Sequence, residues 1–391
     1  MQTFRTKRKF GFLLFAISIA AACACLWLTN SGSFLASQIP NNLETVEQRR
    51  ATAKKPDTTL ADKGRDMILN YRFLPKDFHQ STFDDLWRDW PEPLRAIAEK
   101  STPVERREMA FTRYGFSARP DAPEKPMQYV VDSEGWWAMN CFSCHGGKVN
   151  GKMVEGLPNS HISLETLYAD LRKTKLRRGE TFSQMDLGSM VVPMGTSDGT
   201  SNAVIFGIGL MSFRDKDLNI RPRLIPRWVV HHDMDAPAWW HVSKRDRLYI
   251  DGFVQKNHRA LIPFVMDQMN SGKRMRNWED EFKTVYQYIN SLEPPKYPFE
   301  VNRKLAEQGK KVFDSTCASC HGTYGSNPTY PSKIVAIKKI KTDSTRLTAL
   351  TQYDREIYRD SWFAHYGKDE TVVAPIGYQA PPLDGVWASG Q

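Results

Sequence analysis

Two pentapeptides of one pattern constrain this chain more than any other feature of its sequence. Residues 141–145 read Cys-Phe-Ser-Cys-His, and residues 317–321 read Cys-Ala-Ser-Cys-His. Two cysteines three apart, followed at once by a histidine, form the pattern that attaches a c-type haem. On one turn of helix both thiols reach the two vinyl groups of one porphyrin edge, and the histidine then lies beneath the iron. The alternative is a thioredoxin-like redox pair that happens to precede a histidine, and it would have to occur twice.

We therefore expect a metal-binding protein with two covalently attached haem c groups. The attaching thiols would be those of Cys141, Cys144, Cys317 and Cys320, and the proximal iron ligands would be His145 and His321. The two remaining cysteines, Cys23 and Cys25, lie in an apolar N-terminal run, so no pair is left to build a disulfide framework.

The N-terminus has the pattern of an export segment. A basic stretch, residues 5–9, precedes the apolar residues 10–28. The apolar run fits either a cleaved signal peptide or an uncleaved membrane anchor, with a lipoprotein cleavage site at Cys23 as a third alternative. In each case the haem regions would lie in the periplasm or elsewhere outside the cytoplasm, where c-type attachment occurs.

The net charge of +10 raises the question of nucleic acid. No stripe of basic residues interleaved with aromatic ones is present, and no nucleic-acid-binding module is recognised. We expect a solvated basic surface and no nucleic-acid partner. The expected partner is a small redox protein or a quinol-linked electron donor or acceptor. An acidic partner would be attracted by the positive net charge of the chain.

The chain divides by composition into five parts. Residues 1–30 form the signal or anchor, 31–61 a polar tether, and 62–126 a helical extension in short pieces. The first haem domain would span 127–295 and the second 296–391. The run Pro294-Pro295-Lys296-Tyr297-Pro298 between them cannot continue a helix.

Apolar spacing predicts the main elements. Residues 83–90 place Phe83, Leu86, Trp87 and Trp90 on one helical face. Further helices are expected over 163–173, 278–292 and 305–313, the last leading into Cys317. Residues 187–212, rich in Gly, Ser, Thr and Met, predict a loop that lines a site. The predicted fold class is mainly α, with two cytochrome c-like domains and long loop-rich insertions.

The second axial position of each haem separates electron carriers from enzymes. No methionine follows Cys317, and His365 is the last histidine of the chain, so His365 is the candidate for the second haem. Met194 is the preferred methionine for the first haem. The other candidates there are Met185, Met190, Met211, His161, His231, His232 and His241. For each of these residues, an ordinary place in the core or on the surface is the competing interpretation.

A basic and aromatic block follows the predicted loop. Arg221, Arg223 and Arg227 are candidates to pair with haem propionates, because a guanidinium matches a carboxylate bidentately, and a solvated loop is the alternative. Trp239, Trp240 and His241 are the candidate catalytic residues. Packing in the core is the alternative for both tryptophans.

The two motifs, the linker 292–298 and the lead-in 309–313 together resemble the bacterial di-haem c-type cytochromes. This group includes di-haem cytochrome c peroxidases, the methylamine-utilisation di-haem enzyme and the rubber oxygenases. Residues 236–241 and 249–252 look most like the rubber-oxygenase-like branch. The resemblance implies two facing haems, one reactive and one for electron storage or transfer, often with a tryptophan between them. Residues 383–389 resemble a lead-in to a histidine-bearing segment that would follow residue 391, so the resemblance also implies an incomplete second domain.

The function expected on these grounds is an exported di-haem oxidoreductase that couples electron transfer to peroxide or dioxygen chemistry at the first haem. The two motifs begin 176 residues apart, which exceeds what a simple carrier requires and favours a built active site. The alternative is a non-catalytic di-haem electron carrier.

Overall fold

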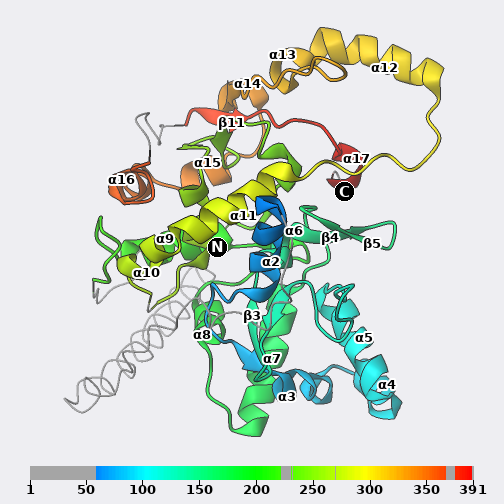
Figure 1. The fold of residues 1–391 in the computed structure, drawn as a ribbon, viewed down its shortest axis with the longest axis vertical. Helices are drawn as coiled ribbons and strands as arrows, with labels where there is room; N and C mark the ends of the chain where they lie inside the picture. The colour runs from blue at the N-terminus through cyan, green and yellow to red at the C-terminus, as the bar shows by residue number, and fades with distance from the viewer. Residues whose placement is uncertain (1–58, 222–229, 231, 269, 367–374, 390–391) are drawn as a thin grey trace, which may run out of the picture. The chain divides into compact units, whose positions relative to one another are not determined.

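The computed structural model describes residues 59–221, 230, 232–268, 270–366 and 375–389, and all of them belong to one compact unit. The architecture is helical with some short strands (Figure 1). The prediction of a mainly helical fold is thus confirmed in this coarser form. The export segment, most of the tether, Arg223, Arg227 and His231 lie outside the described residues. In the ranges described, no helix is both long and apolar enough to span a bilayer.

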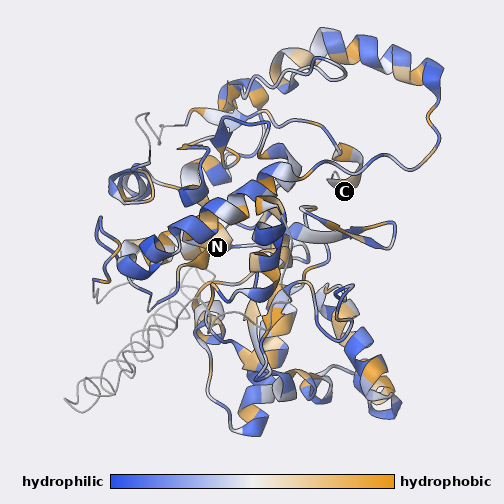
Figure 2. Ribbon diagram, viewed as in Figure 1, coloured by the Kyte–Doolittle hydropathy of each residue, from blue (hydrophilic) through white to orange (hydrophobic). Residues whose placement is uncertain are grey.

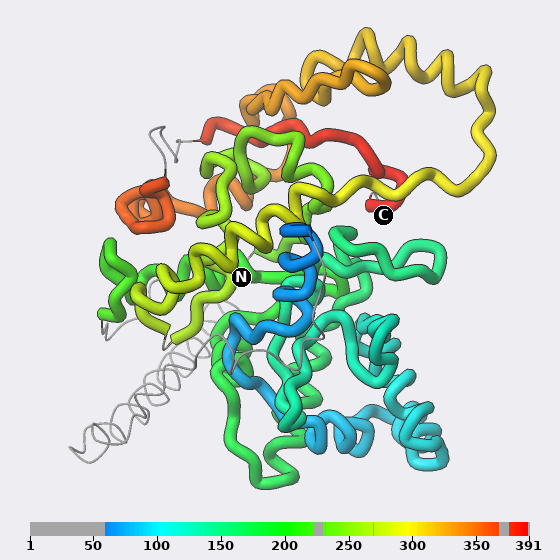
Figure 3. Tube along the Cα trace, in the orientation of Figure 1, coloured from blue at the N-terminus to red at the C-terminus, as the bar shows by residue number. Residues whose placement is uncertain are grey.

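Helix α2 (Leu60–Asn70) packs closely on α11 (Glu279–Ser291), as the blue and yellow-green segments of the tube in Figure 3 show. Gly64 makes this approach possible: a Cβ there would lie 2.4 Å from the carbonyl oxygen of Thr284. The predicted helix over 278–292 is confirmed. Its apolar positions Phe282, Val285 and Ile289 are buried in the largest core cluster.

A three-stranded antiparallel sheet has the order β1–β3–β2. Its strands are β1 (Phe78–His79), β2 (Tyr129–Val131) and β3 (Trp136–Met139). Trp137 pairs with Phe78 on one side and Val131 on the other. The sheet forms part of a second core cluster, rich in aromatic residues, that also includes Leu86 and Trp87.

Residues 80–90 are not one continuous helix. They form α3 (Gln80–Phe83) and the 3₁₀ turn η2 (Leu86–Asp89). Their apolar side chains are buried as expected, because the two short turns face the same core. The extension continues as α4 (Leu94–Lys100) and α5 (Pro103–Tyr114); α5 begins with a capping box between Thr102 and Glu105.

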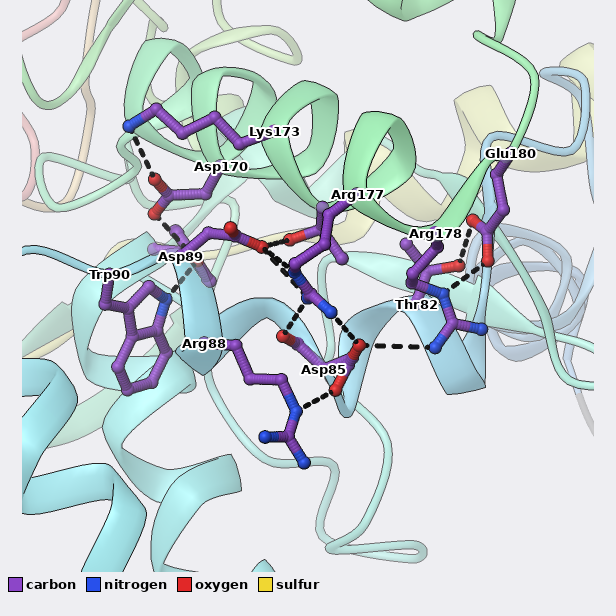
Figure 4. A network of polar contacts seen from close by, with 12 residues as sticks. Thr82, Asp85, Arg88, Asp89, Trp90, Asp170, Lys173, Arg177, Arg178 and Glu180 are labelled. Carbon is purple, nitrogen blue, oxygen red and sulfur yellow. Dashed lines mark hydrogen bonds and ion pairs between the residues drawn. The ribbon is translucent and has the colours of Figure 1, made fainter.

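Helix α7 (Leu164–Arg178) confirms the helix predicted from 163 and extends five residues past its predicted end. Ion pairs tie its C-terminal end to the extension, as Figure 4 shows. Arg177 lies 2.7 Å from a carboxylate oxygen of Asp85 and 2.9 Å from one of Asp89. Because guanidinium and carboxylate match geometrically, a partly exposed network of this kind fixes orientation more than it adds stability.

The loop predicted over 187–212 is wrong. Two helices occupy most of this stretch, α8 (Gln184–Val191) and α9 (Ala203–Ser212). A capping box between Ser183 and Asp186 starts α8. The glycines in α9 lower its helix propensity. The helix forms nevertheless, because it packs against α16 and η4.

The remaining elements before the linker are short. They are α6 (Phe142–His145), β4 (Gly146–Val149), β5 (Lys152–Glu155), β6 (Thr200–Ser201), β7 (Met234–Asp235), η3 (Trp239–His241), β8 (Arg247–Leu248), β9 (Val254–Gln255), η4 (His258–Val265) and α10 (Gly272–Asn277). Strand β4 pairs with β5, so that Gly146 lies opposite Glu155.

After α11 ends at Ser291, the chain has no regular structure until α12 (Arg303–Thr316), in agreement with the predicted linker. Helix α12 runs into Cys317 as expected, yet none of its residues is buried, and Leu305 and Val312 are more than 60% exposed. Figure 2 shows apolar residues among the polar ones along it. The elements that follow are α13 (Ala318–His321), β10 (Ile334–Ala336), α14 (Ile337–Ile340), α15 (Thr345–Ala349), α16 (Gln352–Asp360), β11 (Gly377–Gln379) and α17 (Val386–Ser389).

Candidate functional site

The first motif forms a single helical turn that buried polar side chains hold in place. The side-chain oxygen of Asn140 accepts a hydrogen bond from the amide of Phe142 at the start of α6. Ser143 donates to the carbonyl of Gln128, and the buried amide of Asn159 donates to the carbonyl of Ser143. Because these partners come from both the preceding and the following segment, the fold fixes the motif from several sides.

His145 is half-buried and has a defined orientation. Its Nδ1 lies 3.1 Å from the carbonyl oxygen of Pro237, and its ring stacks on Trp239 with the centroids 4.5 Å apart and the planes 23° apart. A carbonyl partner requires a proton on Nδ1, which leaves Nε2 as a lone-pair donor. Desolvation by burial lowers the pKa of His145 to about 4, so the imidazole is neutral at pH 7. This is the state in which histidine acts as an axial ligand.

The two thiols of the first motif are not joined in a disulfide. Burial raises the pKa of Cys141 to about 12 and that of Cys144 to about 11. A dithiol redox pair works through a thiolate with a lowered pKa. The shifts here have the opposite sign, which argues against the thioredoxin-like alternative at this motif.

The second motif repeats the histidine arrangement. Cys317 caps α12, and His321 ends the short helix α13. Nδ1 of His321 lies 2.8 Å from the carbonyl oxygen of Pro381. The hydroxyl of Tyr324 donates to the carbonyl of His321 and accepts a bond from the amide of Leu383. Each motif histidine is therefore oriented by a prolyl carbonyl from a segment far along the chain, 60 residues away for His321 and 92 for His145.

The segment that contains Pro237 and the segment that contains Pro381 are joined by hydrogen bonds. Trp240 Nε1 donates to the carbonyl oxygen of Asp384 at 2.8 Å, and His241 Nε2 lies 2.9 Å from the same oxygen. Trp240 is fully buried with Ala388 in a small third core cluster. Burial also lowers the pKa of His241. The predicted aromatic block thus connects the surroundings of the two motifs: Trp239 contacts the first, and Trp240 and His241 hold the segment that orients the second. Catalytic roles for the three remain predictions.

A polar network lies beside the stacked pair. Tyr288 contacts Trp239 edge to face, and its hydroxyl donates to a carboxylate oxygen of Glu155. Arg65 donates to the same carboxylate at 2.6 Å. Burial, reinforced by the contact with Glu155, raises the pKa of Tyr288 well above its usual range. This environment holds the phenol protonated. Sequence periodicity gives no signal for it, since Glu155 and Tyr288 are 133 residues apart.

The other predicted ligands lie in ordinary surroundings. Met194 is buried in the aromatic core cluster, and its amide donates to Glu165. His365 is exposed after α16, where its carbonyl accepts a bond from Arg259. The side chain of Arg221 is 69% exposed and lies 3.6 Å from a carboxylate oxygen of Asp215. In the described part of the chain, none of these contacts joins a side chain to either motif, so their roles as ligands or propionate partners stay predictions.

The prediction of a metal-binding site is wrong for the described part of the chain. There, no three His, Cys, Asp or Glu side chains come together in a way that could hold a metal ion. This finding concerns an ion held by protein side chains alone. In each motif the two cysteines and the histidine are not arranged as three donors to one ion, and Nδ1 of the histidine faces a prolyl carbonyl.

Comparisons with known proteins give little further guidance. No protein-family model matches the chain. A protein of Sinorhizobium fredii, described as the uncharacterized protein y4iM, is 27% identical over 188 residues, which covers 39% of this chain and 40% of that protein. The chain therefore spans less than half the length of this relative.

Proposed function

We propose that the chain is a di-haem c-type oxidoreductase, with one haem attached through Cys141 and Cys144 and the other through Cys317 and Cys320. The observation that carries this proposal is the matched pair of histidine contacts. His145 and His321 each direct Nδ1 to a prolyl carbonyl, at 3.1 and 2.8 Å, and so present Nε2 as an axial ligand. The protonated, unpaired thiols of the first motif suit addition to a vinyl group and do not suit a redox pair.

In this proposal residues 127–295 and 296–391 are two cytochrome c-like regions. The haem supplies the redox chemistry when bound. The chain orients the axial imidazoles through Pro237 and Pro381, and it packs the first motif into the largest core cluster, to which Phe142 of the motif and Trp239 belong. Trp239, stacked on His145, is the aromatic group best placed to exchange electrons with the first haem.

The proposed activity is electron transfer coupled to peroxide or dioxygen at the first haem. Electrons would be exchanged with a small redox protein or a quinol-linked donor or acceptor outside the cytoplasm. The contacts of Trp240 and His241 with Asp384 support communication between the two haem regions, because they bind the segment at Pro381 to the segment at Pro237.

The test is to express the full chain in a host that attaches c-type haem and to measure its mass and its electron paramagnetic resonance spectrum. We expect a mass increase of two haems, falling to one in Cys141→Ala/Cys144→Ala and in Cys317→Ala/Cys320→Ala. Absence of covalent haem from the wild-type chain would overturn the proposal.

The spectrum of the oxidised protein then separates enzyme from carrier. A high-spin signal that survives in Cys317→Ala/Cys320→Ala places an open coordination position at the first haem, as the proposed activity requires. Two low-spin signals mean that both haems are six-coordinate, and the carrier function then replaces the enzymatic one.

A further inference from the structure

Three arginines are buried around one carboxylate, with Arg245 and Asp251 from the first predicted haem region and Arg346 and Arg355 from the second. Arg346 on α15 and Arg355 on α16 lie 3.5 and 3.0 Å from the same oxygen of Asp251. Arg245 donates to the side-chain oxygen of Gln379 on β11 at 2.7 Å. All five side chains belong to residues that are at least nine-tenths buried. We call this set the arginine cluster.

The arginine cluster carries more positive charge than its surroundings balance. Asp251 is the acidic group that acts on Arg245 and on Arg346, so three guanidinium groups face one carboxylate. Desolvation lowers the pKa of Arg245 to about 10, which remains above neutrality. The cluster therefore holds two uncompensated positive charges, an arrangement that is costly in a buried site.

Unpartnered donors point to what is missing. Arg245 Nε, both Nε and Nη2 of Arg346, and Nε2 of Gln379 are buried without a hydrogen-bond acceptor among the described residues. Each such group is costly to leave unpaired, because it loses the hydrogen bonds that water would supply. Oδ1 of Asp251 is also without a hydrogen-bond partner among the described residues, so the unpartnered donors outnumber the unpartnered acceptors of the cluster by four to one. Buried N–H donors together with excess positive charge match a planar anion that accepts bidentate bonds, and a carboxylate has that chemistry.

We propose that the arginine cluster binds a carboxylate and that a propionate of the haem at the second motif supplies it. Gln379 lies two residues before Pro381, whose carbonyl orients His321, so the cluster and the second motif share one short segment. This inference rests on the proposed function for the source of the carboxylate, whereas the charge and the unpartnered donors stand without it. The propionate partners at the second haem are then Arg245 and Arg346, and the pairing expected from the sequence for Arg221, Arg223 and Arg227 stays a prediction.

The experiment is thermal unfolding in sodium acetate against sodium chloride at equal ionic strength. Two proteins are compared: the di-haem chain and Cys317→Ala/Cys320→Ala, in which the second motif carries no covalent haem. We expect acetate to raise the melting temperature of the variant by about 2 °C, because it binds the folded state alone, and to leave the di-haem chain unchanged. Adding Arg346→Gln should abolish the response. Adding Arg359→Gln, an exposed arginine on α16, should preserve it.

Each outcome decides a separate question. Stabilisation of both proteins by acetate would keep the carboxylate site but overturn the haem as its source. Stabilisation of neither would overturn the site. Should the cysteine variant not fold, the reduction potential of the second haem decides. Arg346→Gln must then lower that potential and leave that of the first haem unchanged, because a positive charge beside a propionate favours the reduced haem. An unchanged second-haem potential would refute the proposal, and the haem count reports independently on the proposed function.

Discussion

At the residue scale, Asp77 shows how burial sets charge in the N-terminal core. Its two carboxylate oxygens accept hydrogen bonds from Ser183 and Tyr168, both at 2.6 Å. Lys175 is almost fully buried between the carbonyl of Asp77 and the carboxylate of Asp186. Burial, opposed by Lys175 and reinforced by Asp186, raises the pKa of Asp77 to about 6. The folded protein therefore binds this proton more tightly than the unfolded chain, in which the pKa is about 3.9.

This raised pKa predicts a pH dependence of stability. The contribution of protonated Asp77 to the free energy of unfolding is fully present below pH about 4. It is lost as the pH rises through 6. Asp77→Asn cannot ionise, so its free energy of unfolding relative to wild type should rise between pH 4 and pH 7. Urea unfolding at the two pH values measures this. In Asp280→Asn the exposed carboxyl removed has a pKa already lowered by Lys283, so no such rise is expected. The prediction would be contradicted if the free energies of unfolding of wild type and Asp77→Asn differed by the same amount at both pH values.

At the element scale, Gly385 determines how the segment before α17 packs. Its φ is +69°, and a Cβ there would lie 2.9 Å from Cβ of Pro294 and 3.1 Å from the ring of Trp240. Gly385→Ala therefore adds steric contact to left-handed backbone strain of about 1 kcal/mol. Gly179, at the end of α7, has φ of +67° but open space around it. The two substitutions thus share the strain and differ in the contact.

We expect Gly385→Ala to reduce the free energy of unfolding by about 1–3 kcal/mol more than Gly179→Ala. The added contact displaces Trp240 or the 381–388 segment, which also loosens the hold of Pro381 on His321. Chemical unfolding measures the stability difference, and the haem content of the second motif measures the loosening. Equal losses from both variants would show that Trp240 does not confine this segment.

Helices with clear apolar periodicity were predictable from the sequence, but the segments that pack against them were not. The spacing of Phe282, Val285 and Ile289 identifies α11, and the motif itself identifies the end of α12. The sequence misled where glycine and methionine accumulate, because tertiary contacts override low helix propensity in α9. The orienting groups for His145 and His321 are backbone carbonyls, which any residue type supplies. Only the folded chain shows that Pro237 and Pro381 provide them.

At the scale of the whole molecule, the surroundings of the two motifs differ. The first motif lies against the largest core cluster, to which Phe142 and Trp239 belong. The second follows α12, in which no residue is buried and Leu305 and Val312 are strongly exposed. A helix without buried side chains is stabilised by little beyond its own hydrogen bonds, so its amides open locally at low cost. Helix α11 differs from α12 in this respect, because it packs on α2 and has buried side chains.

This contrast predicts amide hydrogen exchange. On the proposed function, the amides of α12 should exchange at least about tenfold faster in Cys317→Ala/Cys320→Ala than in the di-haem chain, because a haem attached at Cys317 and Cys320 would cover apolar surface at the end of that helix. The amides of α11 should be equally protected in both proteins. In Cys141→Ala/Cys144→Ala the effect should move to the first motif and leave α12 unchanged, which separates a local effect of haem from general destabilisation. Mass spectrometry of peptides from 303–316 and 279–291 provides the readout. If α12 is equally protected with and without the second haem, the stability of that helix does not depend on the cofactor, and contacts with another part of the chain or with a partner must account for it.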